Sequence, residues 1–262
     1  MSIISLLSDF GVKDAYVAEM KAIIISINPL VRIMDITHEV EKFSIRAGAF
    51  ILASAAPYFP PKTIHLAVVD PGVGTKRRPI IVETKRSLYV GPDNGLLMLA
   101  ARKEKILNVY AIGNPKYRAS NVSRTFHGRD IFAPAAAHLS AGIVSSMFGP
   151  KIRDYLFPEF AKKRIEKGEL VGEILHIDDF GNLISNISGE DLKQAEFHKK
   201  NSFDVAVNCN NFKLQFCSAY GNVPVNAPLA LIGSSNFLEL AINQGSACKI
   251  FNAKVGDIIH IS

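Results

Sequence analysis

VVDPGVGTKRRPIIV, residues 68–82, joins an apolar run ending at Asp70 to a loop with two glycines, an arginine pair and a second apolar run. This order is typical of a strand, a tight loop and another strand. Asp70 follows the first strand, where open α/β sheets place reactive groups. Arg77 and Arg78 lie within reach, and since neighbouring strand residues point to opposite faces, one of them faces Asp70. Alone, the stretch also fits a surface loop with a weak ion pair.

A second loop of this kind is SDFGVKDAY, Ser8–Tyr16. It follows the apolar run Ile3–Leu7 and precedes apolar residues at helical spacing over 20–27. Asp9 is therefore expected in a strand-to-helix turn, either as a functional carboxylate or as a simple helix N-cap.

A third loop is RTFHGRDIFAPAAAHL, residues 124–139. His127 precedes a helix of small residues and is flanked by Arg124, Arg129 and Asp130. A histidine there is either solvent-exposed or placed to orient water, donate a proton or bind an anion.

Short β-rich runs alternate with helical patterns up to about residue 145, which indicates an α/β domain around a mostly parallel sheet. The expected strands are Ile3–Leu7, Val31–Ile36, Thr63–Val69, Ile80–Glu83, Leu88–Val90 and Ile106–Ile112. The expected helices are Ala15–Ile27, Ile45–Tyr58, Leu96–Lys103 and Ala133–Gly142.

The pattern changes after residue 147. Residues 148–168 are charged and punctuated by proline, as in a linker. From 169 to 262 short β-like runs separated by turns predict a smaller antiparallel barrel-like domain. The runs are Leu170–Ile177, Leu183–Ile187, Phe203–Val207, Phe212–Phe216, Leu229–Ile232, Leu238–Ile242, Lys249–Phe251 and Ile258–Ile261. The expected domains are thus 1–147 and 169–262.

Composition narrows the function classes. The 262 residues are 48% hydrophobic and 21% charged, as in globular proteins, and no apolar run approaches the roughly 18 residues of a membrane span. The net charge is +6, but the basic residues are scattered, so nucleic-acid binding is not expected. Cys209, Cys217 and Cys248 lack zinc-like spacing, and with no secretion signal they suggest reduced thiols in the cytoplasm.

The three loops, together with VGPDNG (90–95), IDDFGNLISNI (177–187) and GSSNFLELAINQGSA (233–247), resemble one family over nearly the whole chain. These motifs are similar to those of the S-adenosylmethionine (SAM) hydroxide adenosyltransferases, the adenosine-forming SAM hydrolases related to fluorinase and chlorinase. Asp70 stands where the halogenating relatives have an aromatic hydroxyl, and His127-Gly128 where they have a Tyr-Ser pair. The resemblance therefore favours the hydrolase branch.

The resemblance implies attack of water or hydroxide on the ribose 5′ carbon of SAM, giving adenosine and methionine. Its catalytic set corresponds to Asp70, Arg77 and His127: Arg77 keeps Asp70 ionised, and His127 orients the water or shares its proton. The sulfonium is already an activated leaving group, so no metal and no cofactor is expected.

Binding roles are carried over from the same resemblance. Asp9 matches the ribose-hydroxyl acceptor, and Asp178 the acceptor of the methionine ammonium, with Asp179 as a local alternative. Phe180 and Asn182 match adenine contacts. The remaining matches are Ser234, Ser235 and Glu239 near the methionine tail and Ala247 near adenine. The family also implies a homotrimer, with each site between the N-terminal domain of one subunit and the C-terminal domain of its neighbour.

Three other functions are compatible with the residues. A metal-dependent hydrolase of a nucleotide-like substrate could use oxygen-rich ligands from Asp9, Asp70, Asp93, His127 and Asp130. A non-catalytic adenosine or SAM sensor would use the same pocket without turnover. A basic RNA-interacting protein would bind in a salt-dependent way.

Overall fold

The computed structural model describes residues 2–166, 168–208 and 210–262, so Cys209 lies outside the described residues. The chain forms two compact units, Met1–Pro158 and Glu159–Ser262, each with its own hydrophobic core. No helix in the described ranges is both long enough and apolar enough to cross a lipid bilayer.

The first unit is built on a six-stranded sheet in the order β2-β1-β3-β5-β4-β6. Its strands are β1 (Ile3–Ser8), β2 (Arg32–Thr37), β3 (Ile64–Val68), β4 (Pro79–Thr84), β5 (Leu88–Pro92) and β6 (Ile106–Ala111). The pairs β1–β2, β1–β3 and β3–β5 are parallel, and β4 is antiparallel to both of its neighbours. The predicted mostly parallel α/β sheet is confirmed.

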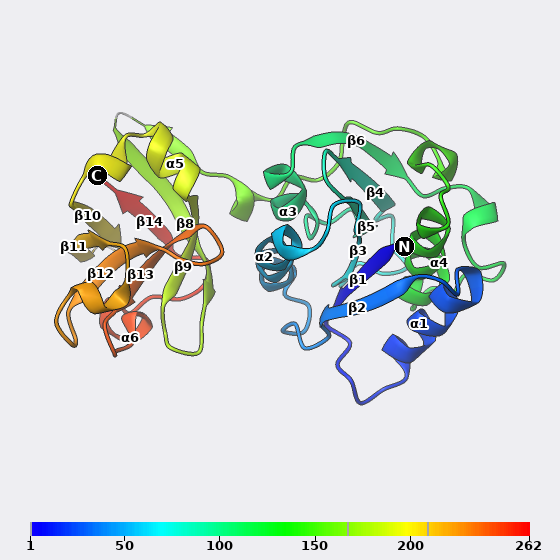
Figure 1. The fold of residues 1–262 in the computed structure, drawn as a ribbon, viewed down its shortest axis with the longest axis horizontal. Coiled ribbons are helices and arrows are strands. Elements are labelled where there is room, and N and C mark those ends of the chain that lie inside the picture. The colour runs from blue at the N-terminus through cyan, green and yellow to red at the C-terminus, as the bar shows by residue number, and fades with distance from the viewer. Residues whose placement is uncertain (1, 167, 209) are drawn as a thin grey trace. The chain divides into compact units, whose positions relative to one another are not determined.

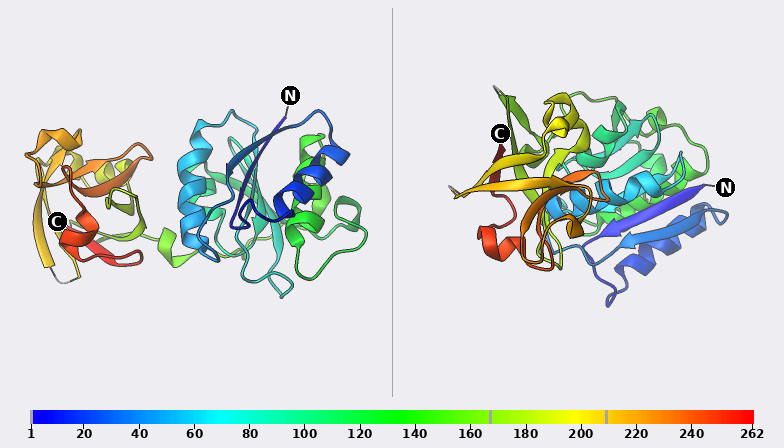
Figure 2. Two further views of the ribbon diagram at one scale, coloured as in Figure 1. Left: turned by 90° about the horizontal axis from the view of Figure 1, so that it is seen from below. Right: turned by 60° about the vertical axis from the view of Figure 1, so that its left-hand side comes forward.

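Helices cover both faces of this sheet (Figures 1 and 2). Helix α1 (Tyr16–Ile27) packs with α4 (Ala133–Ser140), and α2 (Ile45–Ala55) packs with α3 (Met98–Lys103) on the opposite side. On the α1 side, buried residues such as Met20 and Ile24 meet the apolar side chains of β1 and β3. The sheet is therefore fixed from both sides, and the loops at its strand ends carry the polar motifs.

Two local details differ from the sequence-based expectation. The helix predicted for Ile45–Tyr58 ends as an α-helix at Ala55 and continues as a 3₁₀ turn over Ala56–Tyr58, because Pro57 lacks the amide hydrogen that the α-helix needs. Residues Gly128–Phe132, expected in a loop, form a π-helical turn that leads directly into α4. His127 is therefore held at the start of a helix.

The second unit is a closed seven-stranded barrel, because β14 pairs with both β10 and β8 and so joins the ends of the sheet. Its strands are β8 (Glu169–Ile177), β9 (Leu183–Ser188), β10 (Ser202–Val207), β11 (Asn210–Cys217), β12 (Pro228–Ile232), β13 (Phe237–Ile242) and β14 (Ile258–Ile261). A short strand, β7 (Arg164–Glu166), adds to β8. The barrel is antiparallel as predicted, apart from the parallel pair β11–β12.

One predicted strand of this unit is wrong. Lys249–Phe251 belongs to helix α6 (Ala247–Phe251), whose N-cap Ser246 accepts a hydrogen bond from the Lys249 amide at 3.4 Å. A run of three residues is too short to show a periodicity that separates strand from helix. Helix α5 (Gly189–Gln194), which was not predicted, begins with a capping box between Ser188 and Asp191.

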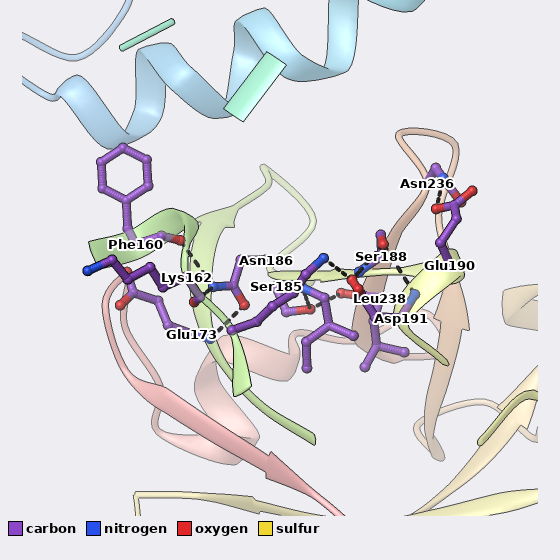
Figure 3. A network of polar contacts seen from close by, with 12 residues as sticks. Phe160, Lys162, Glu173, Ser185, Asn186, Ser188, Glu190, Asp191, Asn236 and Leu238 are labelled. Atoms are coloured by element: carbon purple, nitrogen blue, oxygen red, sulfur yellow. Dashed lines mark hydrogen bonds and ion pairs between the residues drawn. The ribbon is translucent and has the colours of Figure 1, made fainter. Parts of the chain in front are cut away.

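The segment that enters the barrel is tied to it by a polar network (Figure 3). The buried Asn186 amide donates to the carbonyls of Phe160 (3.0 Å) and Lys162 (2.8 Å), and its oxygen accepts from the Glu173 amide (3.0 Å). Lys163 forms an ion pair with Asp191. Residues 160–163, placed in a linker by the sequence, are thus part of the second unit's structure.

Candidate active site

Asp70 and Arg77 form a buried ion pair in the loop between β3 and β4. Arg77 Nε donates to Asp70 Oδ1 at 3.1 Å, and Arg77 Nη2 donates to Asp70 Oδ2. The side chains are only 5% (Asp70) and 7% (Arg77) exposed, and the guanidinium carbon lies 5.2 Å from the ring centre of Phe132. This two-point contact fixes the plane of the guanidinium.

His127 joins this pair through the same guanidinium. Arg77 Nη2 lies 3.0 Å from His127 Nδ1. Arginine only donates hydrogen bonds, so Nδ1 is the acceptor and the ring proton of neutral His127 is on Nε2. Burial lowers the pKa of His127, and the charge of Arg77 lowers it further. The geometry therefore favours a neutral imidazole with an Nε2–H donor.

Arg77 also has an unused donor. Its Nη1 is buried and has no hydrogen-bond partner in the described part of the chain. Buried donors are almost always paired, so this one marks a place where a water, a hydroxide or a ligand oxygen would be stabilised.

Close backbone packing holds the Asp70 and His127 loops together. Gly74 has φ +75°, and a Cβ at this position would collide with the carbonyl oxygen of Arg124. Beyond that contact, Asp130 accepts hydrogen bonds from the Ser123 amide (2.8 Å) and from Arg129 Nε (2.7 Å). The backbone on both sides of His127 is thus fixed.

The structure separates the two adjacent arginines. Arg78 donates to Asp93 (2.7 and 3.0 Å) and to the Asp154 carboxylate (2.9 and 3.0 Å), away from Asp70. Arg77 is the arginine that faces Asp70 and His127. Their divergence matches the alternation of neighbouring side chains in extended chain, here in the two residues that precede β4.

Asp9 follows β1 and is 6% exposed. Its Oδ2 accepts the Phe43 amide at 3.0 Å, and its backbone carbonyl accepts from Lys42 Nζ. It does not cap α1, whose N-cap is Ala15. Phe43, which no sequence pattern singled out, has φ +65° and a side chain 71% exposed.

The second unit carries a cavity of about 640 Å³ beside the DDFGN turn. Its lining residues are Asp178, Phe180, Asn182, Tyr220, Ile242, Asn243, Gln244, Gly245 and Ser246. Asp178 builds the turn: Oδ1 accepts the amides of Phe180 (3.0 Å) and Asn182 (2.9 Å), and Oδ2 accepts from the Asn182 side chain at 2.9 Å. Asp179 is exposed and does not line this cavity, which favours Asp178 of the two.

The other predicted binding residues of the second unit are not among the described residues that line this cavity. Ser234 and Ser235 are in the turn between β12 and β13, and Glu239 on β13 is 6% exposed and accepts a hydrogen bond from Tyr220. Ala247 is fully buried in the core and does not line the cavity; its neighbours Gly245 and Ser246 do. Tyr220 and 243–246 were missed, although the motif at 233–247 already marked part of this region.

The carboxylates proposed as metal ligands are already engaged. Asp70 pairs with Arg77, Asp93 with Arg78, and Asp130 with Arg129. Within residues 2–166, 168–208 and 210–262, no three His, Cys, Asp or Glu side chains are grouped to hold a metal ion. The metal-hydrolase interpretation is therefore not favoured by the geometry.

The protein thus combines two parts: an α/β unit that carries an Asp–Arg–His set, and a β-barrel unit that carries a cavity lined in part by aromatic residues. Comparison with known families identifies the class that has this combination. Residues 4–149 match the SAM hydroxide adenosyltransferase N-terminal domain, and residues 172–260 match the C-terminal domain. The chain belongs to the SAM hydroxide adenosyltransferase family.

Named relatives agree with this placement. The chain is 35% identical to the (R)-S-adenosyl-L-methionine hydrolase of Methanocaldococcus jannaschii, covering 100% of this chain and 96% of that protein. It is 36% identical to the enzyme of the same name from Thermus thermophilus, covering 95% of each. Fluorinases also match, at 25–27% identity. A solved structure from Thermotoga maritima superposes with a TM-score of 0.87 at 38% identity, covering 98% of this chain and 99% of that one.

Proposed function

We propose that this protein hydrolyses S-adenosyl-L-methionine to adenosine and L-methionine. The proposal is supported by the relatives named (R)-S-adenosyl-L-methionine hydrolase, which also make the (R) configuration at sulfur the expected substrate epimer. The observation that carries it is Arg77, which bridges Asp70 and His127 and keeps Nη1 as a buried, unpaired donor within the described part of the chain.

In this reaction the C5′–S bond breaks as a C5′–O bond forms, and methionine leaves with the bonding electron pair as a neutral thioether. Attack by hydroxide needs no further proton transfer, whereas attack by water releases one proton. Arg77 Nη1 and His127 Nε2–H are both donors, so they stabilise an oxygen that carries negative charge. We infer that this set holds a hydroxide-like oxygen, and that His127 orients it rather than removing a proton from it.

The binding half of the proposal uses the second cavity and Asp9. A carboxylate accepts several hydrogen bonds, so Asp9 can hold ribose hydroxyls while Phe43 fixes its orientation. Asn182 has the donor and acceptor needed to read an adenine edge. Phe180, 80% exposed, offers an aromatic face to the base. The negative charge of Asp178 suits the methionine ammonium.

We further propose a homotrimer, in which the first unit of one subunit and the second unit of its neighbour complete each site, as the family resemblance implies. A mixing experiment tests this arrangement. Asp70→Ala and Asn182→Ala proteins, each strongly impaired alone, should regain activity after they are unfolded and refolded together. If the mixture stays as inactive as its components, each site is built within one chain.

No metal and no cofactor takes part in the proposed reaction, which EDTA should leave unchanged. The proposed place of action is the cytoplasm, and fractionation of cells with an antibody to the protein tests it.

The direct test of function is product analysis in ¹⁸O-labelled water. Purified protein and SAM should give equal amounts of adenosine and methionine, with the label in the adenosine 5′-hydroxyl. S-adenosylhomocysteine as product would mean methyl transfer, and 5′-methylthioadenosine would mean cleavage on the methionine side; either contradicts the proposal. Binding of adenosine without turnover would support the sensor alternative.

A further inference from the structure

Tyr220 stands between the cavity of the second unit and a buried carboxylate. It lies in a short 3₁₀ turn, Tyr220–Asn222, and its side chain lines the cavity together with Asp178. Its hydroxyl donates to Glu239 Oε2 at 2.7 Å. Glu239 is 6% exposed and is packed so closely on Gly233 that a Cβ there would collide with the carboxylate.

This hydrogen bond decides what the phenol offers to a ligand. A phenol has one proton to donate and lone pairs to accept with. Because the proton of Tyr220 is directed to Glu239, the phenolic oxygen presents acceptor positions, and donation to a carboxylate strengthens it as an acceptor. Asp178 in the same wall is acceptor-only as well.

The charges around the cavity have the same sign. Burial raises the pKa of Glu239, the hydrogen bond from Tyr220 opposes this rise, and the charge of Asp178 adds to it. Burial raises the pKa of Tyr220 too, with Glu239 and Asp178 contributing, so the phenol stays protonated. No lysine or arginine is among the described lining residues, so a cationic ligand group would relieve the repulsion.

We propose that Tyr220 is a specificity-determining residue, whose phenolic oxygen accepts a hydrogen bond from the α-ammonium of the substrate's amino-acid part, beside Asp178, while Glu239 fixes its orientation. The inference rests on the proposed function for the identity of the ligand. An ammonium has three N–H donors, whereas the sulfonium has none. A hydrogen-bond acceptor such as the Tyr220 oxygen therefore binds the ammonium and not the sulfonium.

The test compares two ligands that differ in the ammonium group. S-adenosylhomocysteine carries the nucleoside and the whole amino acid, and 5′-methylthioadenosine carries the nucleoside without it. Tyr220→Phe keeps the ring and removes the oxygen. A hydrogen bond to a charged group is worth enough that the affinity for S-adenosylhomocysteine, measured by calorimetry, should fall about tenfold or more. Affinity for 5′-methylthioadenosine should stay within about twofold.

Two further variants sharpen the comparison. Glu239→Gln keeps the shape but removes the charge, and should also weaken S-adenosylhomocysteine selectively. Ser218→Ala is the matched control, because it removes an exposed hydroxyl that bonds Asn222 in the same turn without touching Glu239. It should bind both ligands like the wild type.

Equal losses for both ligands in Tyr220→Phe would make Tyr220 a wall of the nucleoside pocket and overturn the inference. An unchanged affinity for both ligands, or a wild type that does not bind S-adenosylhomocysteine, would overturn it as well. These measurements need no turnover. A protein that binds both ligands but releases no adenosine from SAM would therefore contradict the proposed function while leaving this test intact.

Discussion

Arg77 Nη2 donates to His127 Nδ1 at 3.0 Å while the same guanidinium also donates to Asp70, so one side chain fixes both the position of the carboxylate and the tautomer of the imidazole. The carboxylate fixes the guanidinium, and the guanidinium fixes the imidazole tautomer. Neutral His127 then presents Nε2–H, and Arg77 keeps Nη1 without a partner among the described residues. This relationship leads directly to two predictions about the reaction.

Asp70→Asn, Arg77→Gln and His127→Ala should each lower kcat on the order of 100-fold, the usual effect of one oriented polar group. KM should change much less, because these groups act on the attacking oxygen. Steady-state kinetics on SAM measures both constants. Lys76→Ala is the matched control, since Lys76 is exposed in the same loop. A variant that lost adenosine affinity but kept kcat would contradict this division of roles.

The titration of His127 should depend on Arg77. Burial and then the charge of Arg77 lower the pKa of His127, so the ring should be neutral at pH 7 and gain its proton only below the ordinary value of 6.5. NMR titration of the His127 ring measures this pKa directly. In Arg77→Gln the pKa should move up, because the positive neighbour is gone. An unchanged pKa in this variant would mean that the charge of Arg77 does not lower the pKa of His127.

A second histidine should affect stability rather than catalysis. His65 is fully buried, bonds Ser5 Oγ at 2.7 Å, and has its pKa lowered to about 4, chiefly by burial. The unfolded chain, with a pKa near 6.5, therefore binds more protons between these values. The contribution of His65 to the free energy of unfolding should therefore fall by about 3 kcal/mol as the pH drops from 6.5 to 4. Below pH 4 this contribution should stay constant.

Urea unfolding of the wild type and His65→Gln at pH 7 and pH 4.5 separates this contribution from that of the carboxylates. The variant is expected to start less stable and to lose less on acidification. Equal losses in the two proteins would show that His65 does not carry the effect.

Gly74→Ala should disrupt the contact between the two catalytic loops. At positive φ an alanine costs about 1–2 kcal/mol, and the collision with the Arg124 carbonyl should add about 2 kcal/mol. Gly142→Ala is the matched control, because Gly142 has φ +95° and open space, with no atom within 4 Å of where a Cβ would stand. Urea denaturation and steady-state kinetics measure the two effects. Gly142→Ala should lose only the free energy that positive φ costs an alanine, whereas Gly74→Ala should lose more free energy of unfolding and should also lower kcat. Similar effects in the two variants would show that the loop contact contributes nothing.

The sequence predicted the Asp70 and His127 loops because each follows or precedes a strongly patterned element. The sequence did not decide whether Arg77 or Arg78 faces Asp70. The alternation of side chains shows that the two point in opposite directions, but not which of them points to Asp70. The sequence missed Tyr220 because the contact with Glu239 joins residues 19 positions apart, which only the pairing of β12 with β11 and β13 brings together. It assigned Lys249–Phe251 to a strand because the helix is defined by the N-cap hydrogen bond of Ser246, which the pattern of hydrophobic residues does not show.

Arg78, the residue that precedes β4, donates hydrogen bonds to Asp154, which lies well past the end of the last α-helix of the first unit. A fragment that stops at residue 149, where the N-terminal family match ends, would discard Asp154 and also the Leu156 amide that bonds Asp93. Arg78 would lose its bonds to Asp154, and Asp93 would lose its bond to the Leu156 amide. Both losses fall beside Arg77, because Arg78 is its neighbour in the chain and bonds Asp93. Production of the first unit as a separate protein, for crystallisation or ligand screening, should therefore retain the chain through Pro158.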